Sequence, residues 1–248
     1  MIRALSFDLF DTLVDLDFQG MPRMKIGDRE ISTTAGSLYE LVPDGLFENL
    51  EAFADALHRI DRENRKIQQG SGIEVSTQQR FEKLLSPIRQ FPESSKAELA
   101  GSLGARHMAL FRKQVRVPEH HREILIALAE RFPLYVCSNF TDSSCAHQVL
   151  RDAGFGGCFE AVVISDAVGI RKPRPEIFEA VLREADCAAH EFLHIGDNLE
   201  ADVAGASAKG MQSAWLTRRV GDPAAVRDRY RGPAPDFEFA DLAELMDL

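Results

Sequence analysis

Residues 4–13 read ALSFDLFDTL, an apolar run that delivers Asp8 and then breaks into a polar turn carrying Asp11 and Thr12. A buried strand accounts for Leu5 and Phe7 but not for a carboxylate at its tip, because an unpaired buried charge is costly. In open α/β sheets, ligands bind beyond the carboxyl ends of the strands, which is where this run places Asp8. The alternative is that the two aspartates are only turn residues or a helix cap. Polar residues in distant parts of the chain favour the ligand-binding interpretation over the turn or cap interpretation.

The composition narrows the class of protein. The 248 residues are 45% hydrophobic and 27% charged, with a formal net charge of −10. The acidic balance, without a block of Lys or Arg, argues against a nucleic-acid partner. No apolar stretch approaches about 18 residues and the N-terminus lacks a basic segment followed by an apolar core, so we expect no membrane span and a cytoplasmic enzyme. The four cysteines have no CxxC spacing and are interpreted as reduced thiols, with Cys137 in the core.

The order of the predicted elements indicates an α/β protein with an insertion. From residue 132 onward, short apolar strands alternate with helices of about ten residues, which is typical of a parallel sheet covered on both faces. Strands are expected at 2–8, 134–137, 161–165, 192–195, 213–216 and 237–239, and helices at 142–153, 175–185, 200–209 and 241–246. Residues 218–234 are expected to form a surface loop that includes one helical turn.

Between the first two of these strands, the pattern is helical. Apolar residues recur at spacings of three and four from 46 to 61, 76 to 89 and 94 to 115. A hairpin is expected before them, with 24–26 turning at Gly27-Asp28 into 30–33. We therefore predict a Rossmann-like core, residues 1–15 and 118–248, and an inserted helical cap, residues 16–117.

Polar residues lie just beyond the ends of several predicted parallel strands, or in the loops that follow those strands. Because strand ends in such a sheet meet at one edge, these groups can lie together although they are far apart in sequence. The residues concerned are Asp8, Thr12, Ser138, Asn139, Lys172, Asp197 and Asp202. Singly, each has an ordinary explanation, as a strand-end turn, a solvated lysine or a residue that complements a helix dipole. Similarly, His194 is interpreted as a packed strand residue rather than a catalyst.

Together, the same residue types support phosphate chemistry. Asp8 can act as a nucleophile that forms a covalent intermediate. The Thr12 and Ser138 hydroxyls can donate to an anion, and Lys172 supplies fixed positive charge. Asp8 and Asp197 offer the hard oxygen ligands that Mg²⁺ prefers.

Four motifs resemble those of the haloacid dehalogenase-like (HAD) hydrolase superfamily. They are FDLFDTL at 7–13, CSN at 137–139, Lys-Pro at 172–173 and GDNLEAD at 196–202, in the order and spacing of that family. The resemblance covers residues 1–15 and about 118–248. It implies a Rossmann-like HAD fold, and an insertion directly after the first motif is similar to the helical C1 cap of that family.

The resemblance also implies roles for individual residues. Asp8 is the expected nucleophile and Lys172 the catalytic lysine of the third motif, while the transferred group is expected to be bound by Thr12, Ser138 and Asn139. The metal is expected to be held by Asp8, the backbone carbonyl of Phe10 and Asp197, with Asp202 in support.

Phe10 departs from the family pattern. Family phosphatases usually carry a general-acid Asp two residues after the nucleophile, and Asp11, one place further on, should point to a different face. The substrate then either has a good leaving group, such as an acyl phosphate, or the chain is a weakly active or non-catalytic anion-binding member. An aromatic residue here is also similar to the 2-haloacid dehalogenase branch, but that branch needs no metal and has Ser where this chain has Asp197.

We therefore predict a Mg²⁺-dependent HAD-type phosphatase of a small phosphorylated metabolite, acting through an aspartyl-phosphate. A 2-haloacid dehalogenase-like hydrolase and a non-catalytic anion-binding protein remain the alternatives, because fold does not fix function. The expected partner is a small-molecule substrate, with neither nucleic acid nor membrane, and the chain is expected to be a monomer or a homodimer.

Overall fold

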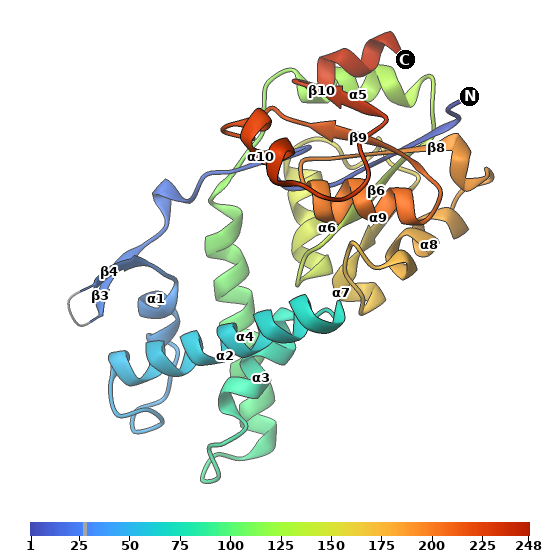
Figure 1. Cartoon of the computed structure of the whole chain (residues 1–248). Helices are drawn as coiled ribbons and strands as arrows, with labels where there is room; N and C mark the ends of the chain where they lie inside the picture. Colours follow the sequence, from blue (N-terminus) through green and yellow to red (C-terminus); the bar gives the residue numbers. More distant parts are fainter. Residues whose placement is uncertain (27–28) are drawn as a thin grey trace. The chain divides into compact units, whose positions relative to one another are not determined.

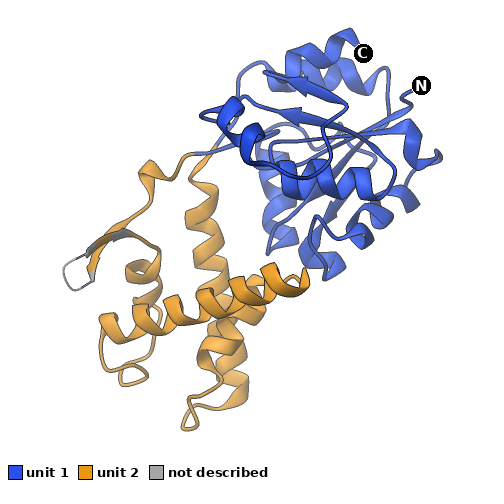
Figure 2. Ribbon diagram, in the orientation of Figure 1, with its two compact units in different colours: residues 1–16, 116–248 blue, residues 17–115 orange. Residues whose placement is uncertain are grey.

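The computed structural model describes residues 1–26 and 29–248, and these divide into two compact units. Unit 1 comprises residues 1–16 and 116–248, and unit 2 comprises residues 17–115 (Figure 2). The strands β2 (Asp15–Leu16) and β5 (Val115–Arg116) lie where the chain passes from one unit to the other. The sequence predicted that the inserted segment covers residues 16–117. Unit 2 covers residues 17–115, so its first residue is one position later and its last residue two positions earlier than predicted.

Unit 1 is built on a six-stranded parallel sheet with the order β10-β9-β8-β1-β6-β7 (Figure 1). In the middle of the sheet, Leu5 pairs with Leu134 on one side and with Leu193 on the other. The strands are β1 (Ala4–Phe7), β6 (Leu134–Ser138), β7 (Ala161–Ile164), β8 (Phe192–Gly196), β9 (Gln212–Leu216) and β10 (Phe237–Phe239). The α/β class and the parallel sheet predicted from the sequence are confirmed.

Helices between the strands bury both faces of this sheet. Ile177 and Phe178 of α8 pack on Ala4, Tyr135 and other residues that point to one side of the sheet. Leu5 and Val136, which point to the other side, are also fully buried. The helices are α5 (His121–Ala129), α6 (Ser143–Asp152), α7 (Ser165–Val168), α8 (Pro175–Arg183), α9 (Ala204–Ala208) and α10 (Pro223–Arg229), with short 3₁₀ helices η2 (Ala189–Glu191) and η4 (Leu242–Asp247).

Three local predictions in unit 1 need correction. The helix expected at 200–209 begins with a π-helical turn, η3 (Leu199–Val203), because the Asn198 side chain accepts from the N–H groups of Glu200 and Ala201 and starts the turn early. Ser165, expected to end a strand, instead begins α7. The helical turn in the 218–234 loop is a full helix, α10, started by Asp222, whose side chain accepts from Ala225 N at 3.0 Å.

Unit 2 is helical and has its own core. Leu57, Phe81 and Leu103, from its three longest helices, lie in one buried cluster. Ser76 and Gln79 form a capping box that fixes the start of α3, as its sequence predicts. The helices are α1 (Ala35–Tyr39), α2 (Leu50–Ser71), α3 (Thr77–Leu85) and α4 (Glu93–Arg112), preceded by η1 (Phe18–Gly20). The sequence did not predict α1.

The predicted hairpin of unit 2 is present as β3 (Arg23–Ile26) and β4 (Arg29–Ser32), which pair antiparallel. Its predicted turn at Gly27-Asp28 lies outside the described residues.

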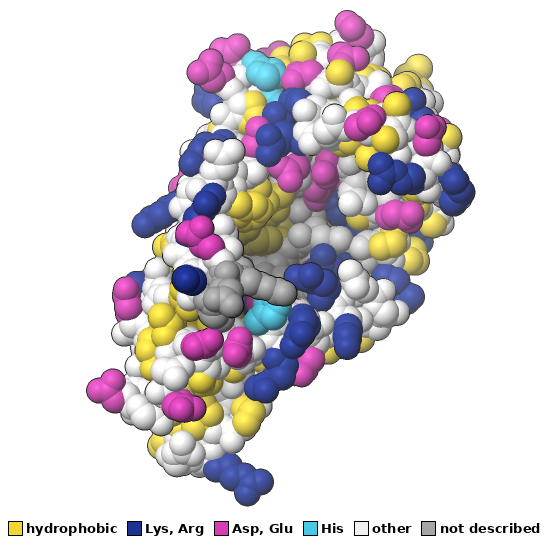
Figure 3. Space-filling view, turned by 60° about the vertical axis from the view of Figure 1, so that its left-hand side comes forward, with side chains coloured by type: hydrophobic (Ala, Val, Ile, Leu, Met, Phe, Trp, Pro, Cys, Tyr) yellow, Lys and Arg dark blue, Asp and Glu magenta, His cyan; other side chains and the backbone are white. Residues whose placement is uncertain are grey.

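The surface carries charges of both signs on the face drawn in Figure 3. No helix in the described ranges combines the length and the apolar character needed to cross a membrane.

Candidate active site

Motif residues from four segments meet at the carboxyl edge of the unit 1 sheet. Asp8 directly follows β1, Ser138 ends β6, and Asp197 directly follows β8. Lys172 arrives from the loop between α7 and α8, and Asp202 from the π-helical turn η3. Because the parallel strands end at the same edge of the sheet, side chains as far apart in sequence as Asp8 and Asp202 share one site.

Lys172 is the centre of this cluster. Its Nζ atom donates hydrogen bonds to Asp8 Oδ1 at 2.7 Å, Asp202 Oδ1 at 2.6 Å and the Cys137 carbonyl oxygen at 2.6 Å. Only 4% of Lys172 is exposed, which excludes the interpretation as a solvated loop lysine. Burial by itself lowers the pKa of Lys172, but the carboxylates of Asp202 and Asp8 outweigh burial and raise that pKa above its ordinary value. The ammonium group is therefore permanently charged.

Asp202 is the second anchor of the cluster. Its Oδ1 atom also accepts from His194 Nε2 at 3.0 Å, and its Oδ2 atom accepts from the backbone N–H of Asn198 at 3.0 Å. Burial raises the pKa of Asp202, but Lys172 and His194 outweigh this effect and hold the pKa well below its usual range. Asp202 is thus an ionised carboxylate that positions Lys172, rather than a simple complement to a helix dipole.

His194 is a positioning residue that the sequence analysis did not find. It is fully buried, as expected of a packed strand residue, and its Nδ1 atom lies 2.8 Å from the Ser6 hydroxyl. Burial lowers the pKa of His194, which favours the neutral ring. Because a carboxylate only accepts, Nε2–H donates to Asp202 and the Ser6 hydroxyl donates to Nδ1. The sequence signal that could have indicated this role is a His two residues before Gly196-Asp197, together with Ser6 in the predicted first strand.

Gly196 makes room for Asp202. A Cβ atom at this position would lie 2.2 Å from Asp202 Cγ and 2.3 Å from Asp202 Oδ2. Distances this short do not occur between non-bonded atoms, so the carboxylate reaches Lys172 only because residue 196 has no side chain. This close approach gives a physical reason for the Gly of the GD pair.

Two buried hydroxyl groups of the site are available to a ligand. Thr12 is 0% exposed and Ser138 is 1% exposed. Within the described residues the Thr12 hydroxyl has no hydrogen-bond partner, and the Ser138 hydroxyl has none of good geometry, although it lies close enough to the Asp8 carboxylate to lower the pKa of Asp8. Buried polar groups are otherwise nearly always paired, so these two are suited to bind an anion carried by a ligand. The role expected of Thr12 and Ser138 toward a transferred group stays a prediction.

Asn139, which was expected to bind the transferred group, hydrogen-bonds to the backbone of Lys172 in this structure. Its Nδ2 atom donates to the Lys172 carbonyl at 3.0 Å, and its Oδ1 atom accepts from the Lys172 N–H at 2.7 Å. Both ends of the amide thus hold the backbone of Lys172, which makes Asn139 a positioning residue for that side chain.

The turn after Asp8 sets the positions of Phe10 and Asp11. Asp11 has a left-handed backbone with φ of 57°, which Asp tolerates better than most residues. Its carboxylate accepts from Leu16 N at 3.2 Å and from Arg219 Nε at 3.3 Å. The Phe10 ring lies 4.7 Å from that of Phe140, which is 8% exposed. The position where family phosphatases carry a general acid therefore belongs to an aromatic pair, and Asp11 is held by other partners.

The carboxylates of this edge form a candidate cation site. One oxygen each from Asp8, Asp197 and Asp202 lies within 4.8 Å of the others. Burial and the neighbouring Asp8 and Asp202 charges raise the pKa of Asp197 to about 8, and burial likewise raises that of Asp8. A hard divalent cation stabilises such grouped carboxylates, so the donor set fits Mg²⁺. Both carboxylate oxygens of Asp202 already accept hydrogen bonds, whereas Lys172 bonds to only one oxygen of Asp8. Asp8 and Asp197 are therefore the residues that could hold the ion.

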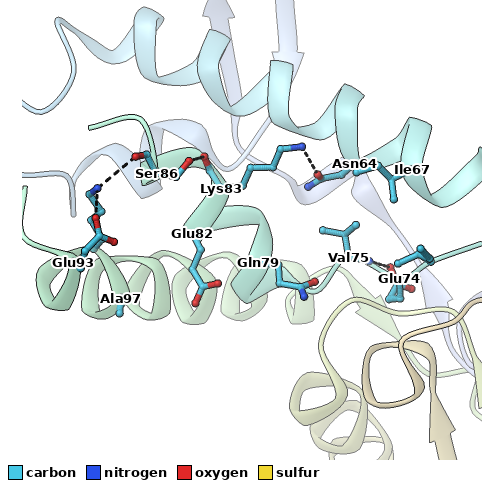
Figure 4. Close-up of a pocket in the computed structure, with 12 residues that line it drawn as sticks. Asn64, Ile67, Glu74, Val75, Gln79, Glu82, Lys83, Ser86, Glu93 and Ala97 are labelled. Carbon is cyan, nitrogen blue, oxygen red and sulfur yellow. Dashed lines mark hydrogen bonds and ion pairs between the residues drawn. The ribbon is translucent and has the colours of Figure 1, made fainter. Parts of the chain in front are cut away.

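A separate cavity of about 640 Å³ lies within unit 2, among α2, α3 and α4 (Figure 4). Lys83 donates to Asn64 Oδ1 at 3.4 Å, and Lys96 donates to Glu93 at 2.7 Å and to the Ser86 carbonyl at 3.4 Å. These cations bind to groups of the cavity wall itself, so we place the candidate active site in unit 1.

Comparison with known proteins decides the family. Residues 2–210 match the model of the haloacid dehalogenase-like hydrolases. The chain belongs to this family. It is an HAD hydrolase whose first motif contains Asp8, and the fold expected from the four motifs is confirmed by solved structures of the family.

The sequence relatives of this HAD hydrolase include enzymes with named substrates. It is 27% identical over 248 residues to the 5-amino-6-(5-phospho-D-ribitylamino)uracil phosphatase YigB of Escherichia coli, covering 100% of this chain and 96% of the relative. It is 30% identical over 219 residues to a glyceraldehyde 3-phosphate phosphatase of Pyrococcus abyssi, covering 87% of this chain and 82% of that enzyme.

Two solved structures share its fold. A 2-haloacid dehalogenase from Pseudomonas syringae has a TM-score of 0.70 and 24% identity, covering 100% of this chain and 97% of that one. The Bacillus subtilis protein YfnB, solved with bound magnesium, has a TM-score of 0.59 and 22% identity, covering 99% of this chain and 97% of that one. At these identities, the likeness concerns the fold.

The substitution Gly196→Ala tests the packing of the site. The new Cβ must displace the Asp202 carboxylate from Lys172 and Asn198, so we expect the free energy of unfolding to fall by about 1–3 kcal/mol. Gly221→Ala is the matched control, because a Cβ at Gly221 has nothing within 4 Å. Urea unfolding of both variants measures the difference, and equal stabilities would contradict this account of the Gly196–Asp202 contact.

Proposed function

We propose that this HAD hydrolase is a Mg²⁺-dependent phosphatase of a small phosphorylated metabolite. The observation that carries the proposal is the hydrogen bond from Lys172 to Asp8, together with the buried hydroxyls of Thr12 and Ser138, the second of which faces Asp8. This arrangement combines a nucleophile, a fixed cation and anion-binding groups. The names of the sequence relatives, which are phosphatases of small metabolites, support the same class of substrate.

In the proposed reaction, Asp8 is the nucleophile. Its free carboxylate oxygen attacks phosphorus in line, the bond from phosphorus to the leaving oxygen breaks, and an aspartyl-phosphate forms on Asp8. Water then attacks the same phosphorus, releasing inorganic phosphate and restoring the carboxylate. Lys172 offsets negative charge on the transferred group in both steps, and the Thr12 and Ser138 hydroxyls donate to its oxygens.

A Mg²⁺ ion would be held by Asp8, Asp197 and the backbone carbonyl of Phe10. When bound, it supplies charge neutralisation between the Asp8 carboxylate and the incoming phosphate. Asp202 and Asn139 support the reaction through Lys172, since each hydrogen-bonds to that residue.

Phe10 limits the leaving groups that the site can serve. An aromatic side chain next to Phe140 cannot protonate a departing alkoxide. Substrates whose leaving group is already stable as an anion, such as acyl phosphates and aryl phosphates, are therefore expected to react faster than alkyl phosphate esters.

A panel of phosphorylated metabolites and 2-chloropropionate tests the proposal. We expect phosphate release by the wild type with Mg²⁺, none with chelator, and a fall of at least about 10³-fold in Asp8→Asn, because an amide is not a nucleophile. Asp197→Asn should shift the Mg²⁺ titration to higher concentrations. Phosphate and halide assays under each condition give the comparison.

Two outcomes would overturn the proposal. Halide release that persists with chelator would move the chain to the dehalogenase class. Phosphate release that is unchanged in Asp8→Asn would remove Asp8 from the reaction.

The substitution Phe10→Asp tests the missing acid. A carboxyl group two residues after the nucleophile should raise turnover of alkyl phosphate esters by at least about tenfold, with little effect on acyl phosphates. Phe10→Asn is the matched control, because it removes the ring without supplying a proton. If both variants change turnover alike on the two substrate classes, Phe10 is not the site of a lost general acid.

A further inference from the structure

Two histidines and an aspartate meet at a second place in unit 1. His120 and His121 begin α5, and Asp241 precedes η4. One ligand atom from each of the three residues lies within 4.8 Å of the others, and the two imidazole rings are 4.8 Å apart in an edge-to-face arrangement. None of the three takes part in the proposed phosphatase reaction.

His121 presents a buried nitrogen lone pair. The residue is 0% exposed, and its Nδ1 atom lies 2.8 Å from the Leu13 carbonyl oxygen. Because a carbonyl only accepts, Nδ1 carries the proton, which leaves Nε2 as an unprotonated acceptor. Nε2 has no hydrogen-bond partner among the residues that the structure describes. A neutral imidazole fixed by a carbonyl on its other nitrogen is the usual state of a metal-ligating histidine.

The other two groups are within reach of solvent. The His120 side chain is 49% exposed and that of Asp241 is 30% exposed, and His120 Nε2 lies 2.8 Å from Asp241 Oδ1. An ion arriving from water can thus replace the proton that these two atoms share. Asp241 Oδ1 also accepts from the Ala243 N–H at 2.9 Å, which fixes the carboxylate in place.

The charges around the three groups tolerate a cation. Burial lowers the pKa of His121, and the positive charge of Arg218 lowers it further. The same charge opposes the binding of a cation. Arg218 is paired with Asp15 through both of its terminal nitrogens, one of them 3.0 Å from Asp15 Oδ2. The pair is neutral overall, and Asp241 adds a negative charge at the site itself.

We propose that His120, His121 and Asp241 form a binding site for a divalent transition-metal ion of the Zn²⁺ type. Two imidazoles and one carboxylate suit Zn²⁺, with a water in the fourth position, and they do not suit Mg²⁺, which prefers oxygen ligands. The buried Nε2 of His121 gains the partner it lacks. Through the bond from His121 to Leu13, the ion would also stiffen the turn that follows Asp8.

Zn²⁺ titration of the metal-free chain, with Mg²⁺ in excess to occupy the carboxylate site, tests the proposal. We expect one Zn²⁺ per chain by calorimetry, an increase in the melting temperature, and visible absorption of tetrahedral Co²⁺ when Co²⁺ replaces Zn²⁺. His120→Ala and Asp241→Asn should each weaken Zn²⁺ binding by at least about tenfold. The half-exposed His120 and the retained cap of Asn at 241 keep both variants folded.

The matched control is His147→Ala, which removes an exposed histidine of α6. It should bind Zn²⁺ as the wild type does. Absence of Zn²⁺ binding by the wild type, or equal affinity of His120→Ala and His147→Ala, would overturn the proposal. The readouts are binding and spectra, so they do not depend on whether the chain is a phosphatase.

Discussion

One buried ammonium group holds the catalytic edge of this protein together. Lys172 donates to Asp8, to Asp202 and to the carbonyl of Cys137, so two strand ends, the turn η3 and the loop that carries Lys172 are tied through a single atom. Breaking such a buried ion pair costs about 3–5 kcal/mol, because the remaining charges lose their partner. Most other features of the site serve this contact: Asn139 holds the Lys172 backbone, His194 holds Asp202, and Gly196 leaves the space that Asp202 occupies.

The sequence predicted the parallel sheet because its strands are short apolar runs that end at polar turns, as at Phe7-Asp8 and Gly196-Asp197. The expectation that Asp8, Lys172 and Asp202 lie near one another agrees with their hydrogen bonds, because parallel strands end at one edge whatever their separation in sequence. The sequence pattern missed α1, which has only five residues and two buried side chains and so shows no apolar period. It misjudged the start of the helix after Asn198, because the Asn198 side chain caps the turn one residue earlier. In unit 2 the largest difference is in α2, which begins after the cap Asn49 and ends ten residues beyond the apolar pattern of 46–61.

Supporting roles were the harder part of the site to predict. Ser138 and Asn139 are neighbours in sequence, yet the Ser138 hydroxyl faces Asp8 while the Asn139 amide bonds the Lys172 backbone. His194 was recognised as a buried strand residue, but its bond to Asp202 depends on register between β8 and the turn η3. The same limit applies to His121, whose neighbour Asp241 comes from 120 residues further along the chain (241 − 121 = 120). Such contacts depend on the tertiary packing of distant segments, which the local sequence pattern does not reveal.

In the proposed reaction, Asp8 receives the phosphoryl group while Lys172, Thr12 and Ser138 bind it. A crystal structure with Mg²⁺ and beryllium fluoride, a mimic of the aspartyl-phosphate, tests this assignment. We expect beryllium bound to a carboxylate oxygen of Asp8, fluorine atoms within hydrogen-bond distance of the other three side chains, and Mg²⁺ on Asp8 and Asp197. Beryllium fluoride bound elsewhere, away from the Thr12 and Ser138 hydroxyls, would show that the assignment is wrong.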